Sequence, residues 1–161
     1  MTRLAGSGID VDVPSGWEGR IYTHSSARGR AGFNSAATRT EQPTTNAVLH
    51  VASFPLPPNT GDYGGGAVEQ MSNKDLLVVL MEHGEESLDT ALFAPQGIPR
   101  VTADDVSTMC LQRLIEGQGG VQKFFTESGR TFCLYVVFGS FARRVRTIAV
   151  VNDILRTITI S

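Results

Sequence analysis

The densest run of glycine lies in residues 54–71, FPLPPNTGDYGGGAVEQM. A glycine-rich loop can cradle phosphate, and in the Gly-x-x-x-x-Gly-Lys-Ser/Thr pattern a lysine reaches the phosphate groups. Here the triple glycine of residues 64–66 is followed by Ala67, Val68 and Glu69, and the Glu69 carboxylate would repel phosphate. The dinucleotide pattern Gly-x-Gly-x-x-Gly and its alternating βα units are also missing. The segment therefore predicts a turn between a strand and a short helix.

Histidine and cysteine could supply a nucleophile or a metal site. The chain has three histidines, His24, His50 and His83, and two cysteines, Cys110 and Cys133. A cysteine beside a histidine can form a nucleophilic pair, and three histidines can hold zinc. Neither reading is supported by a short metal-ligand or redox spacing, and no Gly-x-Ser-x-Gly elbow occurs. We assign no catalytic residue, metal ligand or cofactor, and expect both cysteines to be buried, reduced thiols.

Three arginines stand close together in the segment GSFARRVR, residues 139–146. Arg143, Arg144 and Arg146 lie where a helix is expected to begin, and the positive end of a helix dipole disfavours cations. Their position is explained if an anionic partner binds there. It is also explained if the acid-rich segments 82–89 and 104–105 pack beside them. The first explanation makes these arginines candidate partner-binding residues, and the second makes them part of an internal charge network.

Length and composition limit the remaining classes. The chain has 161 residues, is 41% hydrophobic and carries a net charge of −2. This length suits one domain over residues 1–161 with its own core. The weak negative charge argues against a general nucleic-acid binder. Because no signal-type or membrane-length apolar run is present, we expect a cytoplasmic protein without a membrane or nucleic-acid partner.

The elements that must position these residues are mainly strands. Alternating apolar and polar residues predict one-sided strands, and the continuous apolar run DLLVVLMEH predicts a central strand buried on both faces, with a helix as the alternative. The turn SGW and the hairpin-like SGR connect neighbouring strands. The strands are expected at GIDVDVP (8–14), WEGRIYTH (17–24), AVLHVASFPL (47–56), DLLVVLMEH (75–83), STMCLQRLI (107–115), VQKFFTE (121–127) and RTFCLYVVFG (130–139).

Two segments differ from this strand pattern. Residues 25–46 are small and polar with one aromatic residue, which predicts a flexible loop. From residue 141 onward the apolar period becomes helical, with Ser140 as the expected N-cap and ITIS as a short extended end. Val145, Ile148, Ala149, Asn152 and Leu155 fall at helical spacing. Of these, Val145, Ile148, Ala149 and Leu155 are expected to face the sheet, against Val78, Leu80, Leu134 and Val136.

The two ends of the chain resemble a known family. The opening IDVDVPSGWEGRIY is similar to the strand, Pro-x-Gly-Trp, strand entry of PsbP/Mog-like domains. The end, RTFCLYVVFGS followed by VNDILRTITI, resembles the final strand and helix of those domains. The resemblance implies an antiparallel sheet between helical layers, in a non-catalytic domain that works by binding a partner. It carries over no functional residue.

Together these patterns predict an α+β protein with an antiparallel β-sheet and a long C-terminal helix packed on one face, in an α/β/α sandwich of the PsbP/Mog-like type. The expected function is a protein-interaction or accessory domain with an unidentified protein partner, and a homo-oligomer is an open alternative. A small-ligand-binding protein or enzyme, with a pocket between sheet and helix, is the other class. An exposed apolar patch with no cleft favours the first class, whereas a cysteine and a histidine in an open cleft favour the second.

Overall fold

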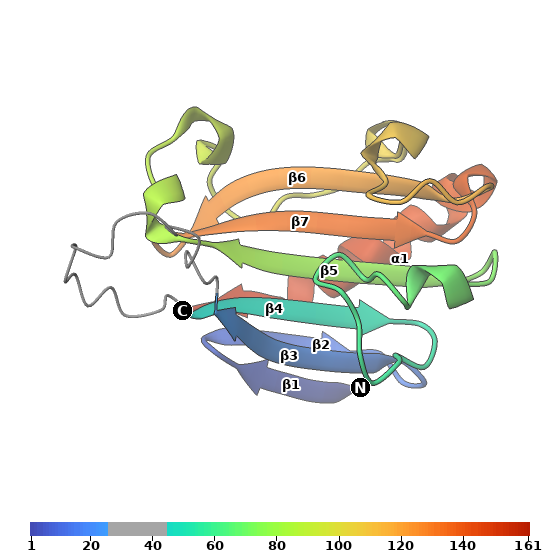
Figure 1. Cartoon of the computed structure of the whole chain (residues 1–161), viewed down its shortest axis with the longest axis horizontal. Coiled ribbons are helices and arrows are strands. Elements are labelled where there is room, and N and C mark those ends of the chain that lie inside the picture. The colour runs from blue at the N-terminus through green and yellow to red at the C-terminus, as the bar shows by residue number, and fades with distance from the viewer. Residues whose placement is uncertain (26–44) are drawn as a thin grey trace, which may run out of the picture.

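The computed structural model describes residues 1–25 and 45–161. These residues form two antiparallel sheets and one α-helix, so the predicted α+β class is confirmed (Figure 1). The three-stranded sheet has the order β1 (Thr2–Gly6), β2 (Ile9–Val13) and β8 (Thr159–Ile160). The five-stranded sheet has the order β3 (Glu18–Ser25), β4 (Thr45–Ala52), β5 (Leu76–His83), β7 (Arg130–Phe138) and β6 (Gly119–Glu127).

The helical elements are one α-helix and several single 3-10 turns. The helix α1 spans Arg144–Thr157. In the part of the chain that the structure describes, no helix is both long and apolar enough to cross a membrane. The single 3-10 turns are η1 (Val68–Gln70), η2 (Glu85–Ser87), η3 (Ala91–Phe93), η4 (Ala103–Asp105), η5 (Thr108–Cys110) and η6 (Phe141–Arg143).

The predicted flexible loop of residues 25–46 lies almost wholly outside the described residues. Its margins belong to strands, because Ser25 ends β3 opposite Thr45, and Asn46 pairs with His24. The strand that follows has the predicted two faces. Val48 and Ala52 join one core cluster, whereas Leu49 and Val51 join the other.

Strand β5 occupies the centre of the five-stranded sheet, between β4 and β7. Its residues 76–81 are all buried and alternate between the two core clusters, so the predicted central strand is confirmed and the helical alternative is wrong. The hairpin between β6 and β7 is also confirmed. Ser128 and Gly129 both have positive φ, as a tight two-residue turn requires.

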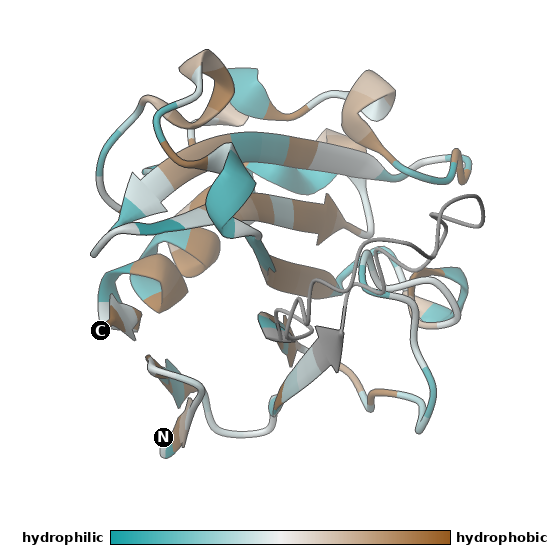
Figure 2. Cartoon of the chain, turned by 60° about the vertical axis from the view of Figure 1, so that its left-hand side comes forward, coloured by the Kyte–Doolittle hydropathy of each residue, from teal (hydrophilic) through white to brown (hydrophobic). Residues whose placement is uncertain are grey.

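Helix α1 lies behind the five-stranded sheet in Figure 1 and packs against one face of it. Val151, Ile154 and Leu155 share a core cluster with the predicted sheet contacts Val78, Leu80, Leu134 and Val136. In Figure 2 the helix, beside the C-terminus label, carries both hydrophobic and hydrophilic segments. The helix therefore supplies part of the apolar cover for this face, together with Ile9, Val11 and Val13 of β2.

The helix is rotated relative to its predicted orientation. Val145 is 67% exposed and Ala149 is also exposed, so the prediction that they belong to the core is wrong. Ile148 is only partly buried. Val151 and Ile154 are buried in their place. Asn152 is buried beside them, where its Oδ1 accepts from the Val101 N–H at 2.9 Å and its Nδ2 donates to the Val101 carbonyl at 2.8 Å. The helix also begins later than expected, after η6, and Ser140 makes no side-chain capping bond.

Among the described residues, the opposite face of the sheet is covered mainly by two loop segments and not by an α-helix. Residues 107–115 were predicted as a strand, but they form η5 and irregular chain, and only Ser107 makes a β-bridge, to Gly120. The Ser107 side chain accepts from the Met109 N–H at 3.0 Å and so favours the 3-10 turn. The other covering segment is the glycine-rich one, which crosses in front of the sheet in Figure 1.

Candidate functional site

The glycine-rich segment is held to the sheet by polar side chains of β3 and β4. Arg20 donates to the Pro57 carbonyl at 2.9 Å. The fully buried His50 contacts the Asp62 carbonyl through Nε2 at 2.9 Å and the Thr60 hydroxyl through Nδ1 at 3.3 Å. Because a carbonyl only accepts, Nε2 carries the proton and Nδ1 accepts from Thr60. Burial lowers the pKa of His50, so this histidine is a neutral anchor for the loop.

The glycines themselves form the predicted turn. Gly64 has a φ of +83°, and a Cβ there would lie 2.4 Å from a Leu77 methyl, so the position requires glycine. The turn leads into η1, as expected of a turn before a short helix. The Gly66 N–H donates to the Glu69 carboxylate at 2.8 Å. A side chain of the segment therefore occupies a donor that a phosphate loop would offer to its ligand.

A cavity of about 230 Å³ lies beside this turn. Residues 61–68 form one wall and residues 111–118 form the other, while Tyr135 and Val137 of β7 provide the floor. Both floor residues belong to the core cluster on the face opposite α1. The cavity thus lies between the sheet and two loops, on the side of the sheet away from the helix.

The polar groups around the cavity are few. Gln118 is 4% exposed, and its Nε2 donates to the Val68 carbonyl at 2.8 Å. The Tyr135 hydroxyl accepts from the Gln112 N–H at 2.9 Å, and burial raises the pKa of this phenol. At the rim, Arg113 and Glu69 form an ion pair of 2.7 Å that joins the two loops. The site is therefore mostly apolar, with a few fixed hydrogen-bonding groups, as small-molecule pockets are.

A second cavity, of about 270 Å³, lies between α1 and residues 98–100. Asn152 lines it, but both polar atoms of this amide are bonded to Val101. It offers less recognition chemistry than the cavity over Tyr135.

The three arginines predicted from the sequence lie at the start of α1. Arg143 and Arg146 are exposed. The guanidinium of Arg144 lies 3.9 Å from the centre of the Phe141 ring and donates to the Phe141 carbonyl at 3.0 Å. Within residues 1–25 and 45–161, no ion pair joins any of the three to an acid, and Asp105 instead pairs with Lys123 at 3.1 Å. Pairing with the acid-rich segments does not account for their position.

Apolar residues surround these arginines on the outer side of the helix. We call this area the basic helix surface, and it consists of Ala142, Arg143, Val145, Arg146, Ala149 and Val150, all of them exposed. The sequence pattern singled out the arginines, and their role in binding a partner stays a prediction. The pattern did not indicate the apolar part, because Val145 and Ala149 were assigned to the core.

The cysteines and histidines do not assemble into a reactive group. Cys133 is buried, with a pKa raised to about 11 by desolvation, but Cys110 is only half-buried, so its predicted burial is wrong. The 3-10 turn at residues 108–110 explains the difference, since it replaces the expected buried strand. Among the described residues, no three His, Cys, Asp or Glu side chains lie where they could share a metal ion.

Comparisons of the chain with family models, with curated proteins and with solved structures gave no match. The resemblance to PsbP/Mog-like domains therefore stays a prediction, and the site must be interpreted from its own geometry.

Proposed function

We propose that this protein is a non-catalytic interaction domain that binds an acidic, partly apolar protein segment through the basic helix surface. The observation that carries the proposal is the exposure of Val145 between Arg143 and Arg146, which have no acidic partner among the described residues. Arg144 supports the surface from one side through its contact with Phe141.

The chemistry of the surface indicates the kind of partner. Arginines near a helix N-terminus are disfavoured by the helix dipole, and a carboxylate of a partner would remove this cost. Exposed Val145 and Val150 would lose contact with water against apolar side chains of the same partner. Arginine is also one of the residue types enriched among those that contribute most to the binding energy of protein interfaces.

Two other anionic partners fit less well. Recognition of an anionic membrane surface usually needs a cluster of about 4–8 basic residues. Nucleic-acid binding depends on extended neutralisation of phosphates, which the net charge of −2 does not favour. The expected cytoplasmic location and the PsbP/Mog-like sandwich are compatible with the proposal and remain predictions.

The test compares two charge-reversal variants of the purified protein as baits in an extract of the native cell. Arg143→Glu with Arg146→Glu changes the basic helix surface. Lys74→Glu with Arg100→Glu is the control, since it makes the same change in net charge at two exposed sites outside the basic helix surface that form no ion pair with another described residue. Only the first variant should lose the partner that the wild type captures, while both keep nearly the wild-type melting temperature. Loss should be clearest at low salt, where charge attraction is strongest.

Equal loss in both variants would indicate a response to overall charge and contradict the assigned surface. Full retention of the partner by the Arg143→Glu, Arg146→Glu variant would contradict it as well. A photoreactive amino acid at Val145 gives an independent readout, because it should cross-link to the captured partner. The same amino acid at exposed Leu92 serves as the control position.

A further inference from the structure

The cavity over Tyr135 lies on the other face of the sheet from the basic helix surface. A ligand of this cavity would therefore bind apart from the protein partner. Its walls come from two segments far apart in the chain, residues 61–68 and 111–118. The Arg113–Glu69 ion pair holds these segments together at the rim. The structure therefore maintains this space through specific contacts.

The amide of Gln118 provides the first indication of what the cavity takes. Its Nε2 donates to the Val68 carbonyl, and this fixes the amide orientation, because a flipped amide would place two acceptors face to face. The Oε1 atom is then the free end. It is buried and has no hydrogen-bond partner among the described residues. A buried acceptor without a partner is costly and calls for a donor that the chain itself does not supply.

The other lining residues restrict the character of that donor. Val68, Leu111 and Val137 are apolar, and the Tyr63 ring meets the Tyr135 ring edge-on, with centroids 5.3 Å apart. The charged side chains of the lining are Arg113, which Glu69 neutralises, and Asp62. The Asp62 carboxylate accepts from the Tyr22 hydroxyl at 2.7 Å. These walls disfavour an anion and favour a neutral molecule with an apolar, ring-shaped body.

The Tyr135 hydroxyl adds a second polar position on the floor. Its oxygen accepts from the Gln112 N–H, which leaves its own proton free to donate. A molecule with one donor and one acceptor can therefore complement both Gln118 and Tyr135. A volume of about 230 Å³ is slightly below the usual range for drug-sized ligands, roughly 300–1,000 Å³, and suits one ring or two fused rings.

We propose that this cavity is a binding site for a small, neutral, ring-containing molecule whose N–H or O–H group donates to Oε1 of Gln118. Water alone is the competing occupant. The cavity is far larger than the roughly 10–15 Å³ that one water needs, and its apolar walls offer water few of the two to four partners it requires. A ring with one donor satisfies both the apolar walls and the acceptor.

Matched probes test the proposal on the wild-type protein without any substitution. Phenol is compared with anisole, and indole with N-methylindole, in titrations followed by backbone amide NMR shifts. Each pair shares a ring and differs in the donor. Phenol and indole should shift the amides of residues 61–68 and 111–118 and bind about tenfold more tightly than their methylated partners. Benzoate, which carries a charge on a similar ring, should bind more weakly than phenol.

Substitution of the acceptor is the second arm. Gln118→Met removes Oε1 and should abolish the difference between phenol and anisole. Gln122→Met is the matched control, because Gln122 is a partly buried glutamine on the neighbouring part of β6 that does not line the cavity. This control should keep the tenfold difference.

Three outcomes would overturn the proposal. The first is that no probe shifts the lining amides at millimolar concentration, which is the result expected for a cavity that holds only water. The second is equal affinity for phenol and anisole in the wild type. The third is a preference for benzoate over phenol, which would show an anion site. None of these depends on whether Gln118→Met folds, and none bears on the basic helix surface.

Discussion

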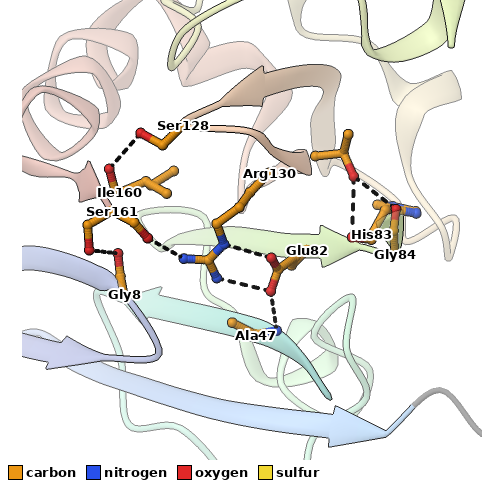
Figure 3. A network of polar contacts seen from close by, with 10 residues as sticks. Gly8, Ala47, Glu82, His83, Gly84, Ser128, Arg130, Ile160 and Ser161 are labelled. Atoms are coloured by element: carbon orange, nitrogen blue, oxygen red, sulfur yellow. Dashed lines mark hydrogen bonds and ion pairs between the residues drawn. The ribbon is translucent and has the colours of Figure 1, made fainter. Parts of the chain in front are cut away.

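Arg130 and Glu82 form a two-pronged ion pair across β7 and β5, with N–O distances of 2.7 and 3.0 Å (Figure 3). Each side chain has a further partner. Glu82 accepts from the Ala47 N–H at 3.1 Å, and Arg130 donates to the Ser161 carbonyl at 3.0 Å. The pair therefore connects three strands of the large sheet with the chain end that completes the small one.

Removal of the guanidinium should leave the Glu82 carboxylate poorly compensated. The two side chains are only 21% and 15% exposed, so the cost should exceed that of a surface pair. We expect Arg130→Met to lower the free energy of unfolding by about 2–3 kcal/mol, measured by urea denaturation. The control Arg3→Met breaks an exposed pair with Asp10 and should cost at most about 1 kcal/mol. Similar losses in the two variants would contradict a central role for the Arg130–Glu82 pair.

Stability should fall below neutral pH because of His50. Burial lowers the pKa of this imidazole from its ordinary 6.5, so the unfolded chain gains a proton more readily than the folded one. The contribution is complete above about pH 6.5 and is lost as the pH falls from there toward the lower folded pKa.

The slope should be at most about 1.4 kcal/mol per pH unit for each such histidine. The pKa of His83 is lowered by burial as well, so both residues contribute. Urea denaturation between pH 7.5 and 5 should show the decline, and His50→Gln should make it shallower than in the wild type. An unchanged slope in His50→Gln would mean that this imidazole does not carry the effect.

The two thiols should react at different rates. Cys133 is buried with a pKa raised to about 11, whereas Cys110 is half-exposed on η5. Because the thiolate is the reactive form, a thiol reagent at pH 8 should modify one equivalent quickly in the native state and a second only on unfolding. Cys110→Ser should abolish the fast phase and Cys133→Ser should leave it intact. A fast phase that survives in Cys110→Ser would contradict the assignment of the fast-reacting thiol to Cys110.

The rotation of α1 can be tested with one substitution at two sites. Val151→Ala removes a fully buried side chain and should cost about 2 kcal/mol of unfolding free energy. Val145→Ala, on the outer side of the same helix, should cost about 0.5 kcal/mol or less. Both losses are measured by urea denaturation. A larger loss for Val145→Ala than for Val151→Ala would contradict the rotated orientation and support the one expected from the sequence pattern.

Elements whose apolar pattern matches their burial could be predicted from the sequence. Strand β2 alternates with Ile9, Val11 and Val13 buried, and β5 is apolar throughout, so both could be predicted. Strand β1 could not, since Leu4 is its one large apolar residue and most of its positions are exposed. Residues 107–115 failed for the opposite reason, because apolar Met109 and Leu114 lie largely in solvent.

The two sites differ in the same way. The arginines at the start of α1 could be singled out from the sequence alone, because a local rule of helix electrostatics marks them as unusual. The cavity was not, because its walls meet only when residues 61–68 and 111–118 fold over Tyr135. The unpaired Oε1 of Gln118 likewise depends on the position of the distant Val68 carbonyl.

The pairing of β2 with β8 has a consequence for the order of events during synthesis. Gly8 and Ser161, which meet at the end of this pairing, are 153 positions apart. At translation rates of roughly 5–20 residues per second, about 8–30 s separate the synthesis of β2 from that of β8. Through that interval the far edge of β2 has no partner, and unpaired strand edges favour aggregation. The small sheet of this protein is therefore expected to form only after translation has reached β8.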